Sequence, residues 1–237
     1  MKINYKKIVL SEDEKYFTYK GKMLWDKSFI NALKFHEPGL APVEDIEGWY
    51  HINIEGEAIY KNRYKKTWGF YCHYSTVKDF HDLCFHIDKQ GKPAYKQRYE
   101  WCGNFQENLC TVRNNNHQYY HINRQGESVY KETYLYAGDY KEGIACVKDT
   151  DGLYKHIDRI GRPVHHKKFM DLGVFHKGFA TAKDKNGWFH IDRKGRALYP
   201  ERYLCVEPFY NGFSLATMFD SNKILVDEYG TNILRIE

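Results

Sequence analysis

The residues best suited to chemistry in this chain are five regularly spaced histidines, each opening a His-Ile-Asp or His-Ile-Asn tripeptide. They are His51, His86, His121, His156 and His190, at successive steps of 35, 35, 35 and 34 residues. Imidazole is a common ligand of zinc and copper. A zinc site, however, needs four donors within about 2.0–2.3 Å of one ion, and equivalent residues of different repeats rarely converge so closely. We therefore interpret these histidines as structural, each forming a hydrogen bond that holds its repeat in place.

Other catalytic patterns are missing from the sequence. No serine lies in a Gly-x-Ser-x-Gly segment, and no glycine-rich phosphate loop is present. The adjacent pair His165-His166 falls where other repeats have an aromatic residue, so we expect local repacking there and not a pair of metal ligands. We predict that the chain is not an enzyme and binds neither a metal nor a cofactor.

The histidines belong to a longer periodic pattern that defines the architecture. A glycine follows each of them by five residues, and the series of glycines extends toward both ends of the chain. The seven glycines in register are Gly21, Gly56, Gly91, Gly126, Gly161, Gly195 and Gly230. Self-similarity at this period indicates tandem repeats that bury their apolar faces against one another. We interpret residues 1–237 as a single repeat domain of seven units, each about 35 residues long.

Each unit reads as a set of short antiparallel strands. Apolar and polar residues alternate in runs such as residues 143–147 and 153–157, and turns containing glycine separate the runs. In the turn at Asp158–Gly161, the aspartate is expected to cap backbone N–H groups and the glycine to take a positive φ. The isoleucine after each histidine is the expected core residue. The pattern predicts three or four strands per unit and no helix.

Residues 187–212 carry a recognisable motif: a Gly-Trp pair, Ile-Asp-x-x-Gly, a following tyrosine and a Phe-x-x-Gly segment. This motif resembles the bacterial WG repeat, and the likeness recurs from about residue 20 to residue 236. The histidine before Ile-Asp is a departure that five units share. The resemblance implies an all-β interaction module and names no ligand.

Seven such units predict an all-β fold, with a seven-bladed β-propeller as the leading architecture. An open β-repeat array is the alternative. The first unit has candidate strands at residues 8–10, 16–19 and 23–25 but lacks an opening strand, whereas the last unit is complete through residues 233–236.

The composition narrows the range of possible partners and of possible cellular locations. The net charge of +5 arises from 36 basic and 31 acidic residues mixed along the chain, which makes nucleic acid an unlikely partner. The sequence has neither a signal peptide nor an apolar run long enough to span a membrane. The six cysteines form no C-x-x-C pair, and some lie in apolar strand patterns, as is typical of reduced thiols. We expect a cytoplasmic protein.

One position varies freely between units and is therefore a candidate surface. It lies two residues after a basic-aromatic step and is occupied by Lys66, Trp101, Tyr136, Asp171 and Cys205. Trp101 and Tyr136, with Trp68 in the preceding unit, are our candidate binding residues, because exposed aromatic residues commonly anchor protein partners. The alternative is that they fill an uneven core. The predicted function is an interaction scaffold that binds a protein. The alternative is an enzyme or small-ligand receptor with a site at the central opening of a propeller.

Overall fold

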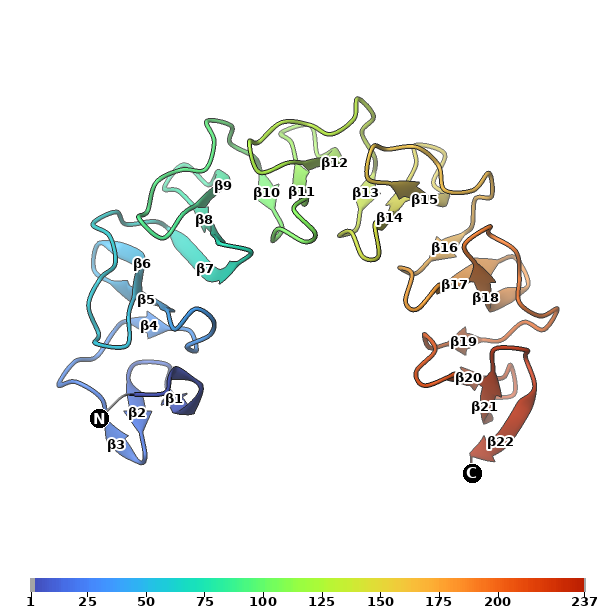
Figure 1. Ribbon diagram of the computed structural model, residues 1–237, viewed down its shortest axis with the longest axis horizontal. Helices are drawn as coiled ribbons and strands as arrows, with labels where there is room; N and C mark the ends of the chain where they lie inside the picture. Colours follow the sequence, from blue (N-terminus) through green and yellow to red (C-terminus); the bar gives the residue numbers. More distant parts are fainter. Residues whose placement is uncertain (1–2, 237) are drawn as a thin grey trace. The chain divides into compact units, whose positions relative to one another are not determined.

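Short strands separated by tight turns make up most of the chain, as the alternation of apolar and polar residues predicts (Figure 1). The computed structural model describes residues 3–236. One 3-10 turn, η1 (Tyr5–Lys7), precedes the first strand. The strands are β1 Ile8–Leu10, β2 Phe17–Tyr19, β3 Lys22–Met23, β4 Asn31–Ala32, β5 Ala41–Asp45, β6 Gly48–Ile52, β7 Lys66–Tyr71, β8 Tyr74–Lys78, β9 Cys84–Ile87, β10 Trp101–Cys102, β11 Cys110–Arg113, β12 Tyr119–Ile122, β13 Tyr136–Ala137, β14 Ile144–Lys148, β15 Tyr154–Asp158, β16 Asp171–Leu172, β17 Phe179–Asp184, β18 Gly187–Asp192, β19 Cys205–Val206, β20 Phe213–Thr217, β21 Lys223–Asp227 and β22 Asn232–Ile236.

Within residues 3–236 the strands form seven small antiparallel sheets, one for each repeat. The sheets are β1-β2-β3, β4-β5-β6, β7-β8-β9, β10-β11-β12, β13-β14-β15, β16-β17-β18 and β19-β20-β21-β22. Sheets of this size, each built from consecutive strands, are the blades from which β-propellers are made. The predicted fold class, all-β with seven units of three or four strands, is confirmed. The first repeat also lacks its opening strand, as expected.

The chain divides into two compact parts, and the division falls within β12. The N-terminal part contains the residues up to His117 together with Ile122–Glu127. The C-terminal part contains Gln118–His121 together with the residues from Ser128 onward. In the part of the chain that the structure describes, no helix is long and apolar enough to cross a membrane.

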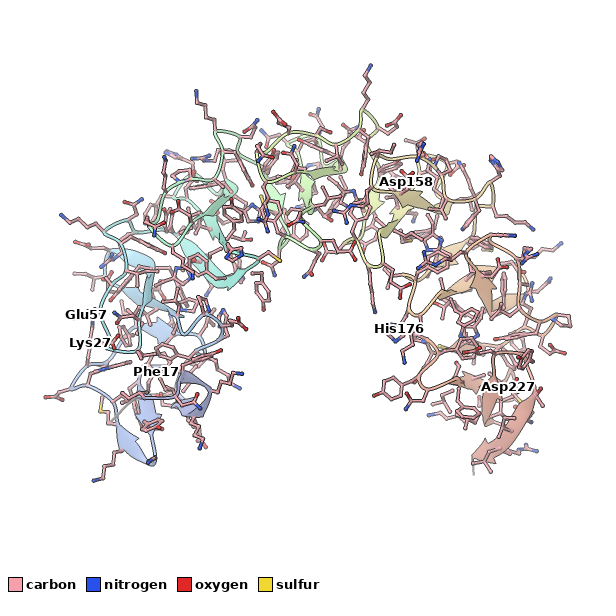
Figure 2. The ribbon with its side chains drawn as sticks, in the orientation of Figure 1. Phe17, Lys27, Glu57, Asp158, His176 and Asp227 are labelled. Atoms are coloured by element: carbon pink, nitrogen blue, oxygen red, sulfur yellow. The ribbon has the colours of Figure 1, made fainter. Side chains whose placement is uncertain are left out.

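The turn after each His-Ile-Asp segment is closed by its acidic or amide side chain. Asp158 Oδ1 accepts hydrogen bonds from the backbone N–H groups of Ile160 and Arg162, at 3.0 and 2.9 Å. Asp227 makes the equivalent pair of bonds in the last repeat (Figure 2). Gly161 ends the first of these turns with a φ of +81°. The predicted turn chemistry is therefore confirmed.

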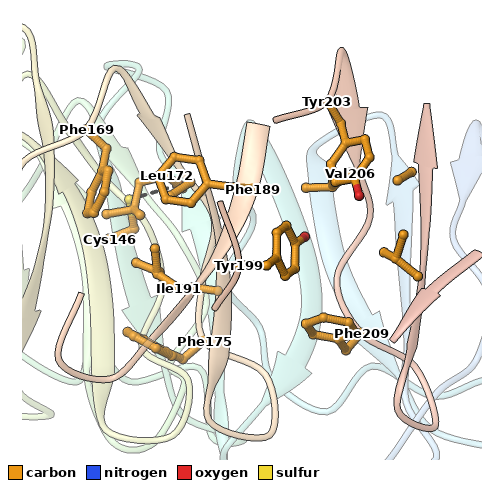
Figure 3. Close-up of a cluster of buried hydrophobic side chains, with 14 of the residues drawn as sticks. Cys146, Phe169, Leu172, Phe175, Phe189, Ile191, Tyr199, Tyr203, Val206 and Phe209 are labelled. Atoms are coloured by element: carbon orange, nitrogen blue, oxygen red, sulfur yellow. Dashed lines mark hydrogen bonds between the residues drawn. The ribbon is translucent and has the colours of Figure 1, made fainter. Parts of the chain in front are cut away.

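Each sheet buries side chains on both faces, because an interior sheet has a neighbour on either side. Ile52, Ile87, Ile122, Ile157 and Ile191 are fully buried, and so are the histidines that precede them. Phe17 occupies the isoleucine position of the first repeat and is equally buried (Figure 2). In the C-terminal part, aromatic and aliphatic side chains from successive sheets, among them Phe175, Ile191 and Phe209, form a continuous apolar cluster (Figure 3).

A large ring from one repeat lies directly against the turn glycine of the next. A Cβ added at Gly161 would lie 2.7 Å from both Cβ and Cγ of Tyr130. The same ring position is taken by Tyr60 at Gly91, by Tyr95 at Gly126 and by Tyr199 at Gly230. We call this ring the anchor of its repeat. Glycine is required here for space as well as for its positive φ.

Two glycines distinguish the requirement for a positive φ from the requirement for space. Gly152 and Gly161 share a φ of +81°, but a Cβ at Gly152 would meet nothing within 4 Å. Gly152→Ala should lower the free energy of unfolding by about 1–2 kcal/mol, the cost of a left-handed alanine. Gly161→Ala should cost about 1–3 kcal/mol more, because the anchor Tyr130 must move. Urea unfolding of both variants measures the difference, and equal losses would show that the anchor contact is unimportant.

Candidate functional site

The five repeated histidines form the same pair of hydrogen bonds in each repeat. His86 Nδ1 lies 2.5 Å from the Tyr95 hydroxyl, and its Nε2 lies 3.0 Å from the Gly103 carbonyl oxygen. Equivalent Nε2 contacts of 2.7 to 2.9 Å are made by His51, His121, His156 and His190. A carbonyl only accepts, so Nε2 carries a proton; burial disfavours a second proton, so Nδ1 accepts, from the tyrosine hydroxyl or, for His156, from His165. Each imidazole is therefore neutral and has both nitrogens occupied.

This arrangement leaves no nitrogen lone pair for a metal. Among residues 3–236, no group of three or more His, Cys, Asp or Glu side chains could hold a metal ion. The geometry is that of a structural hydrogen bond, since the carbonyl acceptor of His86 follows β10, the first strand of the next sheet. The histidines thus position the sheets.

His165 takes over the role of the anchor tyrosine in one repeat. Its Nε2 lies 3.1 Å from His156 Nδ1, and its ring lies against Gly195. Because His156 donates through Nε2 to the Gly173 carbonyl, His165 must donate through its own Nε2. Its Nδ1 is then an acceptor, and within residues 3–236 this buried atom has no hydrogen-bond partner. The neighbouring His166 is exposed, so the two histidines do not act as a ligand pair.

Two substitutions should change stability in opposite directions. His121→Ala leaves the Tyr130 hydroxyl and the Gly138 carbonyl without their imidazole partner and should cost about 1–3 kcal/mol. His165→Tyr restores the usual hydroxyl donor, removes the orphaned nitrogen and should gain about 0.5–1.5 kcal/mol. Thermal and urea unfolding test both, with His166→Ala as the neutral control. Added zinc should leave the melting temperature unchanged, and a zinc-induced rise that His121→Ala abolishes would contradict the structural role.

Buried neutral histidines should make the fold sensitive to mild acid. Burial lowers the pKa of His51 to about 3 and that of His86, His121, His156 and His190 to about 4. The folded pKa lies below the unfolded value near 6.5, so the unfolded state binds more protons and stability falls as the pH drops below about 6.5. The free energy of unfolding should therefore decrease between pH 7 and pH 5, above the usual range of carboxylates. His121→Ala should show a shallower decrease, and a flat profile in wild type would contradict this assignment.

The three candidate binding residues are exposed. The exposed fractions are 38% for Trp68, 41% for Trp101 and 46% for Tyr136, so these side chains do not fill the core. Trp101 and Tyr136 open β10 and β13, at the position that varies between repeats. Trp68 lies elsewhere, as the third residue of β7, where its carbonyl accepts the bond from His51. Their role in binding stays a prediction.

In the C-terminal part, the variable position belongs to a row of aromatic and basic side chains. The Tyr136 ring centroid lies 5.9 Å from that of Tyr119 and 6.5 Å from that of Tyr154. Lys148 is paired with Tyr136 across the sheet, and its ammonium lies 5.2 Å from the Tyr154 ring. We call the row the basic–aromatic edge; its members are Tyr119, Tyr136, Lys148, Tyr154, Lys183 and Trp188.

Two lysines leave the basic–aromatic edge positively charged. Lys183 is paired across the sheet with Asp171, at the variable position, and its ammonium lies 5.8 Å from the Trp188 ring. Within the described residues, neither Lys148 nor Lys183 has a carboxylate oxygen within 4.0 Å. The sequence analysis missed these lysines, although a repeat-by-repeat alignment reveals them. A basic residue stands opposite the variable position in four consecutive repeats, as Lys78, Arg113, Lys148 and Lys183.

The N-terminal part contains a separate pocket that the sequence analysis also missed. It has a volume of about 540 Å³ and lies between two turns, with His36, Cys72, His73 and Lys89 among its lining residues. Cys72 and His73 both have positive φ, at +49° and +77°. Three equivalent turns carry a glycine at the second position, as Gly143, Gly178 and Gly212, and the absence of that glycine is the sequence signal. A small polar ligand could bind in such a pocket.

The fold and its repeated contacts define a class of protein, the tandem β-repeat proteins with one small sheet per repeat. The family model described as "WG containing repeat" matches residues 87–116 and 122–154, so the chain contains WG repeats. The predicted resemblance to the WG repeat is thereby confirmed. No curated protein sequence matches the chain.

Several solved structures resemble the fold at low identity. The computationally designed Ika8 protein is 10% identical with a TM-score of 0.54, over 97% of this chain and 83% of that chain. BamB from Moraxella catarrhalis is 11% identical with a TM-score of 0.49, over 100% of this chain and 86% of that chain. The WD40 β-propeller domain of Doa1 is 12% identical with a TM-score of 0.38, over 86% and 77% respectively. At these identities the likeness concerns the fold alone.

Proposed function

We propose that the chain is a non-catalytic scaffold that binds an acidic protein partner through its basic–aromatic edge. The observation that carries this proposal is the position of Tyr136, half exposed between Tyr119 and Tyr154 with the Lys148 ammonium beside them. Rigid aromatic rings held in a row supply contact area at little entropic cost and are frequent anchors of protein interfaces.

The charge of the edge supports an acidic partner. Lys148 and Lys183 both lie over aromatic rings and have no carboxylate neighbour within 4.0 Å among the described residues. Ammonium groups of this kind steer and orient a partner of opposite charge. Binding through them should weaken as the salt concentration rises.

The variable position is free to serve binding because the fold does not depend on it. Asp171 and Cys205 open β16 and β19 at the place where Tyr136 opens β13, and each strand pairs with its neighbour in the same register. Trp101 occupies the equivalent position in the N-terminal part and is similarly exposed. Packing therefore does not require an aromatic residue at this position.

The proposal includes a cytoplasmic location. Cys84 and Cys146 are buried, and burial raises the pKa of both thiols, which keeps them unreactive. Buried thiols of this kind are typical of proteins in a reducing compartment.

Affinity purification from the cells that express the protein, with quantitative mass spectrometry, tests the scaffold. Tyr136→Ala should reduce recovery of the acidic partner, with a loss of about 2 kcal/mol or more in binding free energy, and Trp101→Ala tests the equivalent position of the N-terminal part separately. Tyr229→Ala is the matched control, because Tyr229 is an exposed tyrosine, 84% accessible, in the turn after β21.

The same variants distinguish binding from packing. Exposed aromatic residues can be removed with little effect on folding, so the melting temperatures should stay within the range of the control. A loss of about 3–5 kcal/mol in stability would instead identify core residues. Unchanged partner recovery from Tyr136→Ala would disprove the proposed edge.

A further inference from the structure

A hollow beside the basic–aromatic edge collects large apolar side chains on the surface. It has a volume of about 230 Å³ and is lined by Met170, Leu204 and Phe219, together with Lys183 and the following turn. Met170 and Leu204 immediately precede β16 and β19, and Phe219 lies in the turn between β20 and β21. The three apolar side chains are exposed by 54%, 50% and 63%.

A glycine allows this hollow to form. A Cβ at Gly187 would lie 2.5 Å from the Tyr203 carbonyl oxygen and 2.9 Å from Phe219 Cζ. The Phe219 ring therefore lies over the one position of this turn that has no side chain. Any larger residue at position 187 would displace the ring.

The fold does not require apolar residues around the hollow. The position of Met170 and Leu204 is occupied in two other repeats by charged residues, Lys65 and Glu100, and in two more by Ile30 and Leu135. Lys65 pairs there with Asp82 at 2.7 Å, so the fold accommodates a solvated ion pair at this position equally well. Single exposed apolar residues are ordinary on a protein surface. Three that line one hollow, in a chain with a mean hydropathy of −0.73, indicate a contact surface.

The rim of the hollow is positively charged. Lys183 and Lys185 border it, and within the described residues neither has a carboxylate oxygen within 4.0 Å. The one acidic residue between them, Asp184, is already engaged by Arg202, whose Nε lies 2.9 Å from Oδ2. An apolar group entering the hollow would thus be flanked by two available ammonium groups.

We propose that this hollow receives one large apolar side chain of a peptide segment whose neighbouring residues are acidic. The proposal rests on the proposed scaffold function and specifies the partner's motif: the apolar side chain fills the hollow, and its acidic neighbours meet Lys183 and Lys185. Lys183 belongs to both the hollow and the basic–aromatic edge, so one peptide reaches both.

A corresponding place in the N-terminal part has the opposite charge. Glu44 stands opposite Asn31 in the second repeat as Lys183 stands opposite Asp171 in the sixth. The hollow there, of about 630 Å³, has Ile30 and Ile46 on its surface, and its three carboxylates, Glu44, Asp45 and Glu47, outnumber its two basic residues, Lys27 and Arg63. The same acidic peptide should be repelled at that place, so the chain supplies its own matched control.

Peptide selection on the purified chain tests the proposal. Random peptides displayed on phage are selected against the immobilised protein, and the enriched peptides are synthesised with a fluorescent label for anisotropy titration. We expect a consensus that combines one large apolar residue with flanking Asp or Glu. Leu204→Asp should weaken binding by about tenfold or more, whereas Ile30→Asp, at the equivalent position of the acidic hollow, should leave it unchanged. Phe219→Ala provides a second variant in case Leu204→Asp alters folding.

Several outcomes would overturn the proposal. Failure of any peptide to be enriched would do so, as would a basic or wholly polar consensus or equal binding by Leu204→Asp and Phe219→Ala. Tyr136→Ala distinguishes the two hypotheses: if it weakens peptide binding while both hollow variants bind normally, the edge remains a binding surface and the hollow is not part of it. If the hollow variants alone weaken binding, the hollow is supported and the edge is not.

Discussion

The rest of the structure depends on a buried neutral imidazole whose two nitrogens both have partners. His190 Nδ1 accepts from the hydroxyl of Tyr199, and its Nε2 donates to the Glu207 carbonyl, which follows the first strand of the next sheet. Moving that strand by one residue would bury an unpaired N–H, at a cost of about 1–3 kcal/mol. Apolar contacts between sheets are non-directional, so this polar bond is what makes one register preferable to its neighbours.

The anchor ring serves two contacts at once, and this explains which residues can occupy its position. Tyr130 donates to His121 and covers Gly161 in the next turn. His165 performs both roles for His156 and Gly195, because an imidazole N–H replaces the hydroxyl. In the first repeat the ring that covers Gly56 is Trp25. The histidine position of that repeat is occupied by Tyr16, so no buried imidazole there requires a donor.

Periodicity made most of the fold predictable, because every repeat meets the same physical demands. The turn glycines, the Asp and Asn caps and the core isoleucines each follow from local backbone and burial requirements, which a single sequence displays in one repeat after another. The strand pairs within each repeat follow from the same alternation. The burial of both sheet faces was less evident, since a histidine next to an isoleucine suggests one polar and one apolar face.

The site was harder to predict because its residues come from several repeats and share no motif. The variability of one position indicated Trp101 and Tyr136, which are exposed, yet it did not reveal the lysines across the sheet. Lys148 stands 12 residues after Tyr136, and only the antiparallel register brings the two side chains together. The hollow at Leu204 and Phe219 depends on the conformation of a turn at Gly187, which the sequence pattern does not specify.

The residues that stabilise the fold and the residues proposed to bind a partner occupy separate positions, so the charge of the surface can change sign without disturbing the fold. Glu44 and Lys183 occupy one place in the repeat pattern, and each is paired with the variable residue in the same register. The next residue in each case is an aspartate: Asp45 pairs with Arg63, and Asp184 pairs with Arg202. The guanidinium group of Arg63 lies over the Tyr50 ring, and that of Arg202 lies over the Phe189 ring. The ion pair and the stacked ring hold the sheet edge in place, so the residue above them is free to be acidic in one repeat and basic in another. Under the proposed scaffold function, recognition would therefore depend on which repeat a partner meets.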